Sequence, residues 1–356
     1  MASFDGVLRW RLIGGQPALA SSLGLIVVLT LILLIRTTTK RARASPPLLR
    51  VRLNYQRAPA GPERTRALHH TESWWPFTVP LEVAMRDARV ELGATASLDV
   101  QGFCLRAWPS SCTDLASDEA VVRDYYPSVV ALVRAETGAS DVLVKGHKRY
   151  AGRPPASAEE ADACLRGGCA TVKAGGVGAA VHVDYTARAA AARVAALLRD
   201  GKYHADSATR ARLECALEAW GGGARGADAL LSRRHVALVN VWCNAASTPV
   251  RAKPLAVCDA RSVQRDDFFT ITLADCSETH NAESYVLEAD EAIAQRHHWY
   301  FYPRMRGDER LLFKIADTRA DVAPRAFHAA FDDPSEPRDV PPRQALAVRA
   351  IVIFDP

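Results

Sequence analysis

Three residues of this chain have the types and the spacing that suit a metal ion with open coordination positions. His182 and Asp184 are two residues apart, so in an extended segment their side chains point to the same side of the backbone. The imidazole and the carboxylate can then take neighbouring positions on one ion. His328, 328 − 182 = 146 residues further on, would complete the two-histidine, one-carboxylate set typical of non-heme Fe(II) oxygenases. The competing interpretation is a structural His–Asp pair without a metal.

A second His-x-Asp pair, His204 and Asp206, has a different sequence setting. It follows residues 200–202, Asp-Gly-Lys, which are typical of a helix end, and Asp206 or Ser207 can cap the next helix. The first pair instead lies among apolar and β-branched residues after the glycine-rich residues 175–178, as expected for a strand that leaves a turn. We therefore interpret the first pair as candidate metal ligands and the second as capping residues.

The elements that must position these residues are predicted to be mostly strands. Helices are expected over residues 118–136, 186–200 and 207–220. Strands are expected over residues 141–144, 235–242, 255–258, 268–273, 285–287, 298–302 and 343–354, with His147 in a solvated turn after the first. Many strands separated by turns indicate a β-sandwich or barrel with flanking helices, an α+β protein that is mainly β.

Length and composition are those of a globular protein with a full core. The chain has 356 residues, 49% hydrophobic and 24% charged, and a formal net charge of +5 that comes mostly from its N-terminal third. No basic stripe is interleaved with aromatic residues, so no nucleic-acid partner is expected. Eight scattered cysteines lack zinc-ribbon spacing and favour free thiols in a reducing compartment over a disulfide framework.

The N-terminal region is predicted to anchor the chain in a membrane. Residues 17–35 carry no charge, and at about 1.5 Å per residue they nearly span a hydrocarbon core of about 30 Å. A cleaved signal peptide is the alternative, but its apolar region is usually shorter and Arg36 follows the run directly. Two basic residues precede the run and six follow it: Arg9 and Arg11, then Arg36, Lys40, Arg41, Arg43, Arg50 and Arg52. This excess predicts a single-pass protein whose main domain faces the cytosol.

The expected domain organisation follows from these boundaries. Residues 1–16 form an N-terminal tail, residues 17–35 the transmembrane helix, and residues 36–66 a basic, proline-containing linker. Residues 48–55 within that linker have the alternative interpretation of a strand that leads into the domain. Residues 67–356 form the catalytic domain.

Several segments, in order along the chain, resemble the secondary-metabolite hydroxylase/desaturase family, which includes aspergillic-acid hydroxylase, gibberellin desaturase and the cephamycin 7α-methoxylation protein. The resemblance covers residues 115–355 and is most specific over residues 254–263, Pro-Leu-Ala-Val-Cys-Asp-Ala-Arg-Ser-Val. The other matching segments are residues 239–242, 266–267, 298–303, 308–314, 327–334 and 348–350.

The resemblance implies a double-stranded β-helix (jelly-roll) core that uses Fe(II), 2-oxoglutarate and O₂. His182, Asp184 and His328 stand at the positions of the family's metal-binding motif. The chain departs from the family where Cys243-Asn244 replaces the usual Arg-Pro and where Arg343-Gln344-Ala345 lacks the serine of Arg-x-Ser. The predicted membrane anchor is also not a family feature.

Two arginines on the last expected strand are candidates to bind the far carboxylate of 2-oxoglutarate. Arg343 and Arg349 lie on the same face of that strand, and an arginine in an apolar run needs a partner. Six residues of strand separate them by about 20 Å, so they cannot serve one carboxylate together. Arg343, which begins the strand, is the preferred anchor, and pairing with an acidic residue would explain Arg349.

The predicted function is therefore the hydroxylation or desaturation of a small, lipophilic secondary metabolite at a membrane surface. The alternative from another class is a non-catalytic accessory or binding subunit of the same fold that works with a partner oxidase or methyltransferase. Loss of a metal ligand would favour that alternative, and all three candidates are present. In either case the candidate protein partner is another enzyme of the biosynthetic pathway.

Overall fold

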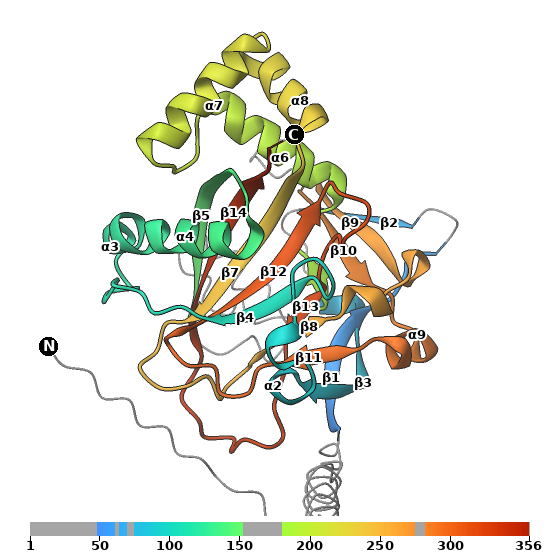
Figure 1. Ribbon diagram of the computed structural model, residues 1–356. Helices are drawn as coiled ribbons and strands as arrows, with labels where there is room; N and C mark the ends of the chain where they lie inside the picture. Colours follow the sequence, from blue (N-terminus) through green and yellow to red (C-terminus); the bar gives the residue numbers. More distant parts are fainter. Residues whose placement is uncertain (1–47, 61–63, 70–74, 152–179, 275–281, 356) are drawn as a thin grey trace, which may run out of the picture. The chain divides into compact units, whose positions relative to one another are not determined.

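The computed structural model describes residues 48–60, 64–69, 75–151, 180–274 and 282–355, and from Leu49 on they belong to one compact unit. Two β-sheets form its frame, with helices around them (Figure 1). The prediction of a mixed α+β protein built mostly from strands is confirmed.

The larger sheet has nine strands and carries both histidines of the candidate site. Its strands, in spatial order, are β1 (Leu49–Gln56), β3 (Thr78–Asp87), β11 (Trp299–Phe301), β8 (Leu255–Cys258), β13 (His328–Ala330), β6 (His182–Val183), β10 (Ala282–Leu287), β9 (Phe268–Ala274) and β2 (Thr65–His69). Apart from the β3–β11 and β9–β2 pairs, neighbouring strands run antiparallel.

The smaller sheet has five strands, all antiparallel to their neighbours. Its spatial order is β4 (Phe103–Ala107), β12 (Glu309–Asp317), β7 (Val236–Asn244), β14 (Gln344–Ile353) and β5 (Asp141–Ala151). Every residue of the central strand β7 is buried, because both faces of this sheet are covered. Val239, Val241 and Cys243 pack on the side of the helix α4 (Tyr126–Thr137), whereas Asn240 and Trp242 point to the opposite side.

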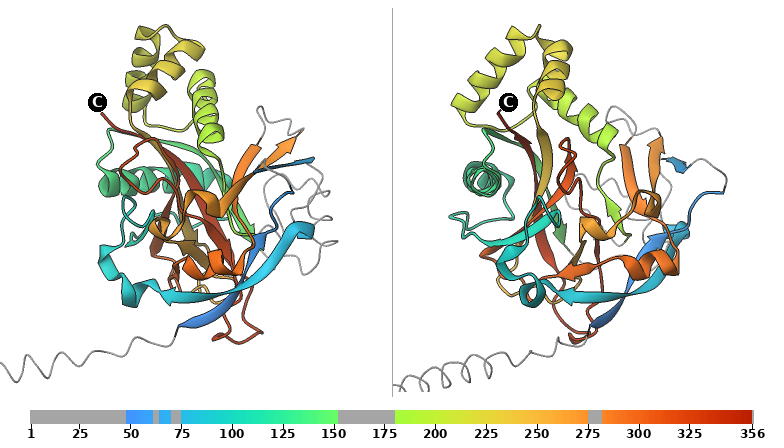
Figure 2. Two further views of the ribbon diagram at one scale, coloured as in Figure 1. Left: turned by 90° about the vertical axis from the view of Figure 1, so that its right-hand side faces the viewer. Right: turned by 45° about the vertical axis from the view of Figure 1, so that its right-hand side comes forward.

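Helices cover the outside of this frame. They are α2 (Ala88–Glu91), α3 (Asp118–Ala120), the π-helical turn η3 (Val121–Tyr125), α4 (Tyr126–Thr137), α6 (Ala187–Asp200), α7 (Ser207–Ala219), α8 (Gly223–Arg233) and α9 (Glu291–Arg296). Short 3₁₀ turns are η1 (Trp75–Phe77), η2 (Gly93–Thr95), η4 (Ala260–Ser262) and η5 (Arg265–Asp267). Figure 2 shows α6, α7 and α8 grouped at one end of the sheets, while α4 lies along the smaller sheet.

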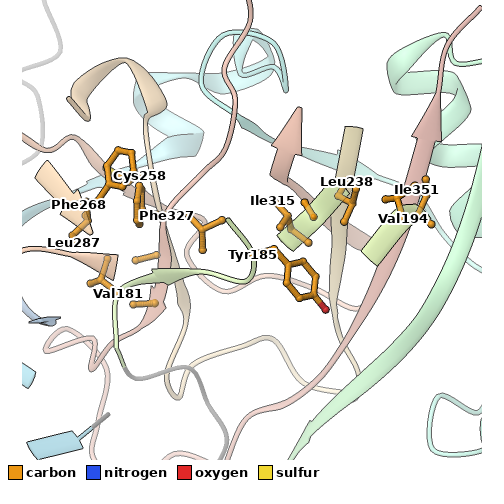
Figure 3. Packing of buried hydrophobic residues seen from close by; sticks show 14 of the residues in the cluster. Val181, Tyr185, Val194, Leu238, Cys258, Phe268, Leu287, Ile315, Phe327 and Ile351 are labelled. Atoms are coloured by element: carbon orange, nitrogen blue, oxygen red, sulfur yellow. The ribbon is translucent and has the colours of Figure 1, made fainter. Parts of the chain in front are cut away.

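The segment that carries His182 and Asp184 is held in the core at both of its ends. Val181 lies on the side of Phe268, Phe327 and Leu287, as Figure 3 shows, and it is fully buried. Tyr185, at the other end, lies on the side of Ile315, Leu238 and Val194 in the same apolar cluster. Because the apolar neighbours on both sides are fixed by packing, the two polar side chains between them are held in place.

The expected helices are present, with the ends that the sequence signals indicate. Ser117 caps the helical segment that begins with α3, and Gly138 ends α4 with a positive φ of 69°. Thr186 caps α6 and Gly201 ends it with a φ of 62°. The helix α8, directly after α7, was not among the expected helices.

Two expectations about strands need correction. The segment predicted as a strand over residues 141–144 continues to Ala151, and His147 lies within β5 instead of in a turn. The strand β5 can hold these polar residues because successive side chains point to opposite faces of the sheet. His147 hydrogen-bonds with Tyr126 and Asp118, whereas Lys148 lines the interior cavity. Part of the expected linker forms β1, which pairs along its whole length with β3, as in the alternative interpretation of residues 48–55.

The remaining expectations concern thiols and the membrane. The cysteines that the structure describes, Cys104, Cys112, Cys215, Cys243 and Cys258, are free thiols, as predicted. The expected transmembrane helix over residues 17–35 lies outside the described residues. Within the described ranges, no helix combines the length and the apolar character needed to cross a bilayer.

Candidate metal centre

The two histidines of the candidate site meet because β6 and β13 are neighbours in the larger sheet. His182 and His328 are direct partners in the antiparallel register, so their side chains lie on the same face. Their ring centroids are 4.5 Å apart. The 146-residue gap in the sequence is thus closed by a single strand pairing.

Backbone carbonyls set the orientation of both imidazole rings. Nδ1 of His182 donates to the carbonyl oxygen of Ala180 over 2.8 Å, and Nδ1 of His328 donates to that of Ala326 over 3.2 Å. A carbonyl oxygen can only accept, so Nδ1 must carry the proton and Nε2 the lone pair in each neutral ring. Burial, followed by the proximity of His182, lowers the pKa of His328 to about 3. At neutral pH this ring is therefore an uncharged nitrogen donor.

The third residue, Asp184, follows directly after β6 and is held as a carboxylate. Burial alone would raise its pKa, but the cations and imidazoles around it, Arg349 first, hold that pKa well below the usual range. Arg349 donates to Oδ2 from Nε over 3.0 Å and from Nη2 over 2.7 Å, and Asn240 donates to the same oxygen over 3.0 Å. The other oxygen, Oδ1, lies 3.5 Å from Nε2 of His182.

The structure therefore brings the three predicted residues together. One ligand atom from each of His182, Asp184 and His328 lies within 4.8 Å of the others, and no other such group occurs in the part of the chain that the structure describes. A cavity of about 70 Å³ adjoins these atoms. It is lined by Lys148, Tyr150, His182, Asp184, Asn240, Trp242, Leu255, Phe313, His328, Arg343 and Ala347.

The two candidate arginines have different surroundings. Arg343, just before β14, is 5% exposed and lines the cavity, and its Nη1 donates to the carbonyl oxygen of Lys253 over 2.5 Å. Its Nε has no hydrogen-bond partner among the described residues. Burial lowers the pKa of Arg343 to about 10. Arg349 is instead paired with Asp184, the acidic partner that the sequence led us to expect for this position.

Several cavity residues were missed by sequence reasoning. Lys148 and Tyr150 come from β5, beyond the point where the strand was expected to end, and Trp242 and Asn240 come from β7. The alternation of β7 was visible in the sequence, but not which of its faces would meet the histidines. A longer strand over residues 141–151 would have placed Lys148 and Tyr150 on one face.

The second His-x-Asp pair does not take part in this site. Asp206 caps α7 by accepting from the backbone N–H of Thr209 over 2.7 Å, as predicted. The backbone of His204 exchanges two hydrogen bonds with Val144, and its ring lies against Tyr126.

Several known proteins have sequences similar to that of this chain. A sequence model described as "Oxidoreductase/YMDC permease-like domain" matches residues 50–353. The Fe(II)/2-oxoglutarate-dependent dioxygenase nvfI of Aspergillus novofumigatus is 27% identical over 303 residues, covering 84% of this chain and 90% of the relative. The hydroxylase/desaturase efuI of Hormonema carpetanum is 28% identical over 329 residues, covering 88% and 98% of the two chains.

A solved structure shows the same fold. The iron and alpha-ketoglutarate-dependent endoperoxidase NvfI, in a structure described as having a different conformation, is 25% identical with a TM-score of 0.62. The match covers 88% of this chain and 99% of that chain. The names of these relatives give iron and 2-oxoglutarate, and the word dioxygenase implies O₂, in agreement with the predicted cofactors; the His-Asp-His group offers the matching ligand atoms.

The resemblance to hydroxylases and desaturases is confirmed by these relatives, and the family match spans most of the described residues. The chain belongs to the oxidoreductase family of the "Oxidoreductase/YMDC permease-like domain" and is an enzyme of that family.

Proposed function

We propose that this chain is an Fe(II)/2-oxoglutarate-dependent oxygenase that hydroxylates or desaturates a small, lipophilic secondary metabolite. The observation that carries the proposal is the convergence of His182, Asp184 and His328, whose ligand atoms lie within 4.8 Å of one another. Two imidazoles and one carboxylate are the ligand set of non-heme Fe(II) oxygenases. The two sheets that carry or face these residues are proposed to form a double-stranded β-helix.

The donor chemistry of the site fits iron. Both histidines hold an Nδ1 proton against a backbone carbonyl oxygen, which leaves Nε2 as the coordinating nitrogen. Asp184 is ionised, and its Oδ1 lies on the side of His182. When bound, Fe(II), 2-oxoglutarate and O₂ would together supply the oxidising power to break an unactivated C–H bond.

Arg343 is the proposed anchor for the far carboxylate of 2-oxoglutarate. It lines the same small cavity as the three ligand residues, and its buried Nε lacks a partner among the described residues. A guanidinium can bind a carboxylate with two parallel hydrogen bonds, which would satisfy this donor. Arg349 cannot take this role while it remains paired with Asp184.

The substrate is proposed to occupy a second, larger pocket. The cavity beside the ligands has a volume of about 70 Å³, which leaves no room for a lipophilic substrate in addition to the metal and 2-oxoglutarate. A neighbouring pocket of about 650 Å³ shares Tyr150 with it. It is lined by Leu115, Ala116, Ser117, Asp118, Glu119, Arg149, Tyr150, Ala245, Gln344 and Ala345. This mixture of apolar and hydrogen-bonding side chains suits a lipophilic molecule that carries a few polar groups.

The direct test uses the full chain, purified in detergent without oxygen. Iron content is measured on this preparation, and succinate release is measured on it after O₂ and 2-oxoglutarate have been added, with and without candidate lipophilic substrates. We expect about one iron per chain and succinate release that stops when 2-oxoglutarate is omitted. Iron binding without succinate release would instead favour the accessory-subunit alternative.

The membrane location is a separate proposal, supported by the uncharged residues 17–35 and by the two-to-six distribution of basic residues around them. We propose that this segment anchors the enzyme with its catalytic domain in the cytosol. Protease added to sealed microsomes should degrade the domain. A protected or glycosylated domain would reverse the orientation.

A further inference from the structure

The carboxylate of Asp184 is bound very unevenly by its neighbours. The three side-chain hydrogen bonds that Arg349 and Asn240 donate to this carboxylate all end on Oδ2, at distances of 2.7 to 3.0 Å. Oδ1 receives none of them and lies on the side of His182. The neighbours therefore distinguish the two oxygens of one carboxylate.

The register of the smaller sheet produces this arrangement. Asn240 on β7 and Arg349 on β14 are direct cross-strand partners, so their side chains leave the sheet next to each other on the same face. Asp184 belongs to the segment after β6, a strand of the larger sheet. The two donors thus connect one sheet to the ligand carried by the other.

Among the described residues, the hydrogen bond to Asp184 is the one recorded for the side chain of Asn240. It is 3% exposed, and its Oδ1 has no hydrogen-bond partner among the described residues. A buried amide normally satisfies both of its ends. Its contact with Asp184 is therefore the interaction that accounts for a polar residue at this position of β7.

Arg349 is itself braced from the far side by Tyr185. The Nη1 of Arg349 donates to the Tyr185 hydroxyl oxygen over 3.1 Å, and Nζ of Lys145 donates to the same oxygen over 2.7 Å. The guanidinium is thus fixed at both ends, by Asp184 and by Tyr185.

A β-bulge places Lys145 in this network. Arg349 pairs with Gly146 and Ala350 pairs with Val144, so Lys145 is the additional residue in β5. Bulges redirect side chains, and here one lysine turns toward the interior near the metal centre. Gly146 has a φ of 154°, which side-chain-bearing residues rarely adopt, so the glycine suits this bulge.

We propose that Arg349 and Asn240, braced by Tyr185 and Lys145, are positioning residues that make Asp184 bind iron through Oδ1 alone. This inference rests on the proposed function. A carboxylate that turns to bind through both oxygens takes a coordination position that 2-oxoglutarate and O₂ need. Hydrogen bonds that occupy Oδ2 prevent that turn, as partners of metal ligands generally fix ligand orientation.

The sign of the effect on metal affinity separates positioning from simple charge compensation. Arg349 is a cation next to a metal ligand, so its removal would strengthen cation binding if charge were its only contribution. If it positions Asp184, its removal weakens binding in spite of the lost positive charge. Asn240 is neutral, so its replacement tests positioning without this opposing effect.

The experiment titrates Co(II) into the metal-free full-length chain and follows the visible absorption of the bound ion. We expect Asn240→Ala and Arg349→Met to weaken Co(II) binding by about ten- to a hundred-fold and to alter the absorption spectrum of the bound ion. Arg349→Lys, which keeps the charge and one donor, should recover part of the loss. Tyr185→Phe should weaken binding less, because it leaves both contacts to Oδ2. Arg199→Met, in α6 and ion-paired with Asp200, makes the same charge change at the surface and should bind Co(II) like the wild type.

The outcomes separate this inference from the proposed function. Co(II) binding that is unchanged or tighter in Asn240→Ala and Arg349→Met overturns it. So does an Arg349→Met protein that binds Co(II) normally but loses 2-oxoglutarate, since Arg349 would then be the anchor. If Arg349→Met does not fold in a thermal melt, Asn240→Ala and Tyr185→Phe decide the question. A wild-type chain that binds no Co(II) contradicts the proposed metal site itself.

Discussion

The chain contains the same short motif twice, and the two copies have unrelated roles. His182 and Asp184 lie beside His328 in the interior, whereas Asp206 caps α7 and the ring of His204 packs on Tyr126. The residue types and their spacing are identical. The difference lies in what surrounds each pair: a neighbouring strand that brings a third donor in one case, and a helix start in the other.

This contrast shows that a two-residue spacing determines only that the two side chains of an extended segment point to the same side. An aspartate before a helix accepts from free backbone N–H groups, which consumes its carboxylate oxygens locally. In Asp206, Oδ1 accepts from the backbone N–H of Thr209 and Oδ2 from its hydroxyl. Asp184 has a distant partner for Oδ2 and keeps Oδ1 on the side of the histidines.

The comparison is tested most strongly by removing, one at a time, the three metal ligands of the site that contains the first pair. His182→Ala, Asp184→Ala and His328→Ala should each abolish iron retention and turnover, because each removes one of three metal ligands. Iron content after gel filtration and succinate release measure this loss. His204→Ala should retain iron and turnover, since the ring of His204 packs on Tyr126 and is not part of the ligand group. If the second pair proved essential for iron, our assignment of the two motifs would be wrong.

The two regions should also differ in how their histidines titrate. In the metal-free protein, His328 should stay neutral from pH 8 down to pH 5, because burial lowers its pKa to about 3. His204 is exposed, and the part of its ring that is buried lowers its pKa from the usual value of 6.5, so it should titrate below that value. NMR titration of the ring signals measures both values.

The lowered pKa of His328 also makes the free energy of unfolding depend on pH, in a direction that can be stated in advance. Between about pH 3 and pH 6.5 the unfolded chain binds a proton at His328 that the folded chain does not, so this residue makes the free energy of unfolding rise with pH. Its contribution is complete above pH 6.5. Urea unfolding of metal-free wild type and His328→Gln at pH 5 and pH 7 should show a smaller pH dependence in the variant. Equal pH dependence would contradict a neutral, buried His328.

The next effect concerns the co-substrate at the first site. Arg343→Ala should raise the apparent 2-oxoglutarate constant by about thirty- to a hundred-fold, since a bidentate charged contact is worth about 2–3 kcal/mol. Iron should remain bound, because Arg343 is not one of the three ligand residues and its hydrogen bond goes to the backbone of Lys253. Arg343→Lys should recover part of the affinity. A normal 2-oxoglutarate constant in Arg343→Ala would exclude this arginine as the anchor.

The smallest effect is expected at the second pair. Asp206→Ala removes the N-cap of α7 and should lower the free energy of unfolding by about 1 kcal/mol without changing iron binding. Urea denaturation measures the loss, and Asp206→Ser should restore most of it. A loss of iron in Asp206→Ala would show that the two regions are coupled.

Sequence signals located the elements whose ends depend on local chemistry. Thr186 and Gly201 delimit α6, and Asp206 begins α7, because caps and left-handed glycines act within a few residues. The strands β7, β8, β9 and β14 were expected near their observed positions because runs of apolar and β-branched residues between turns are also local signals. The full length of β5 was not, since charged residues such as Lys148 concealed a strand whose two faces have different neighbours.

The cavity could not be worked out from local patterns. Its residues come from β5, β6, β7, β8, β12, β13 and β14, and they meet only through the register of two sheets. A shift of one residue in any of these pairings would turn a lining side chain to the opposite face. The bulge at Lys145 is such a local change, and it was not predicted because the strand was expected to end at residue 144, before Gly146.

By itself the amino-acid sequence determined the ligand types, the shared direction of His182 and Asp184, and the capping role of Asp206. These properties depend on backbone geometry over two to four residues. Only the tertiary structure decided that His328 lies beside His182 and that Arg349 forms an ion pair with Asp184. It also decided that Arg343 lines the cavity with an Nε that has no hydrogen-bond partner among the described residues. Those relations depend on strand pairing between residues far apart in the chain, and that pairing is set by the packing of the whole core.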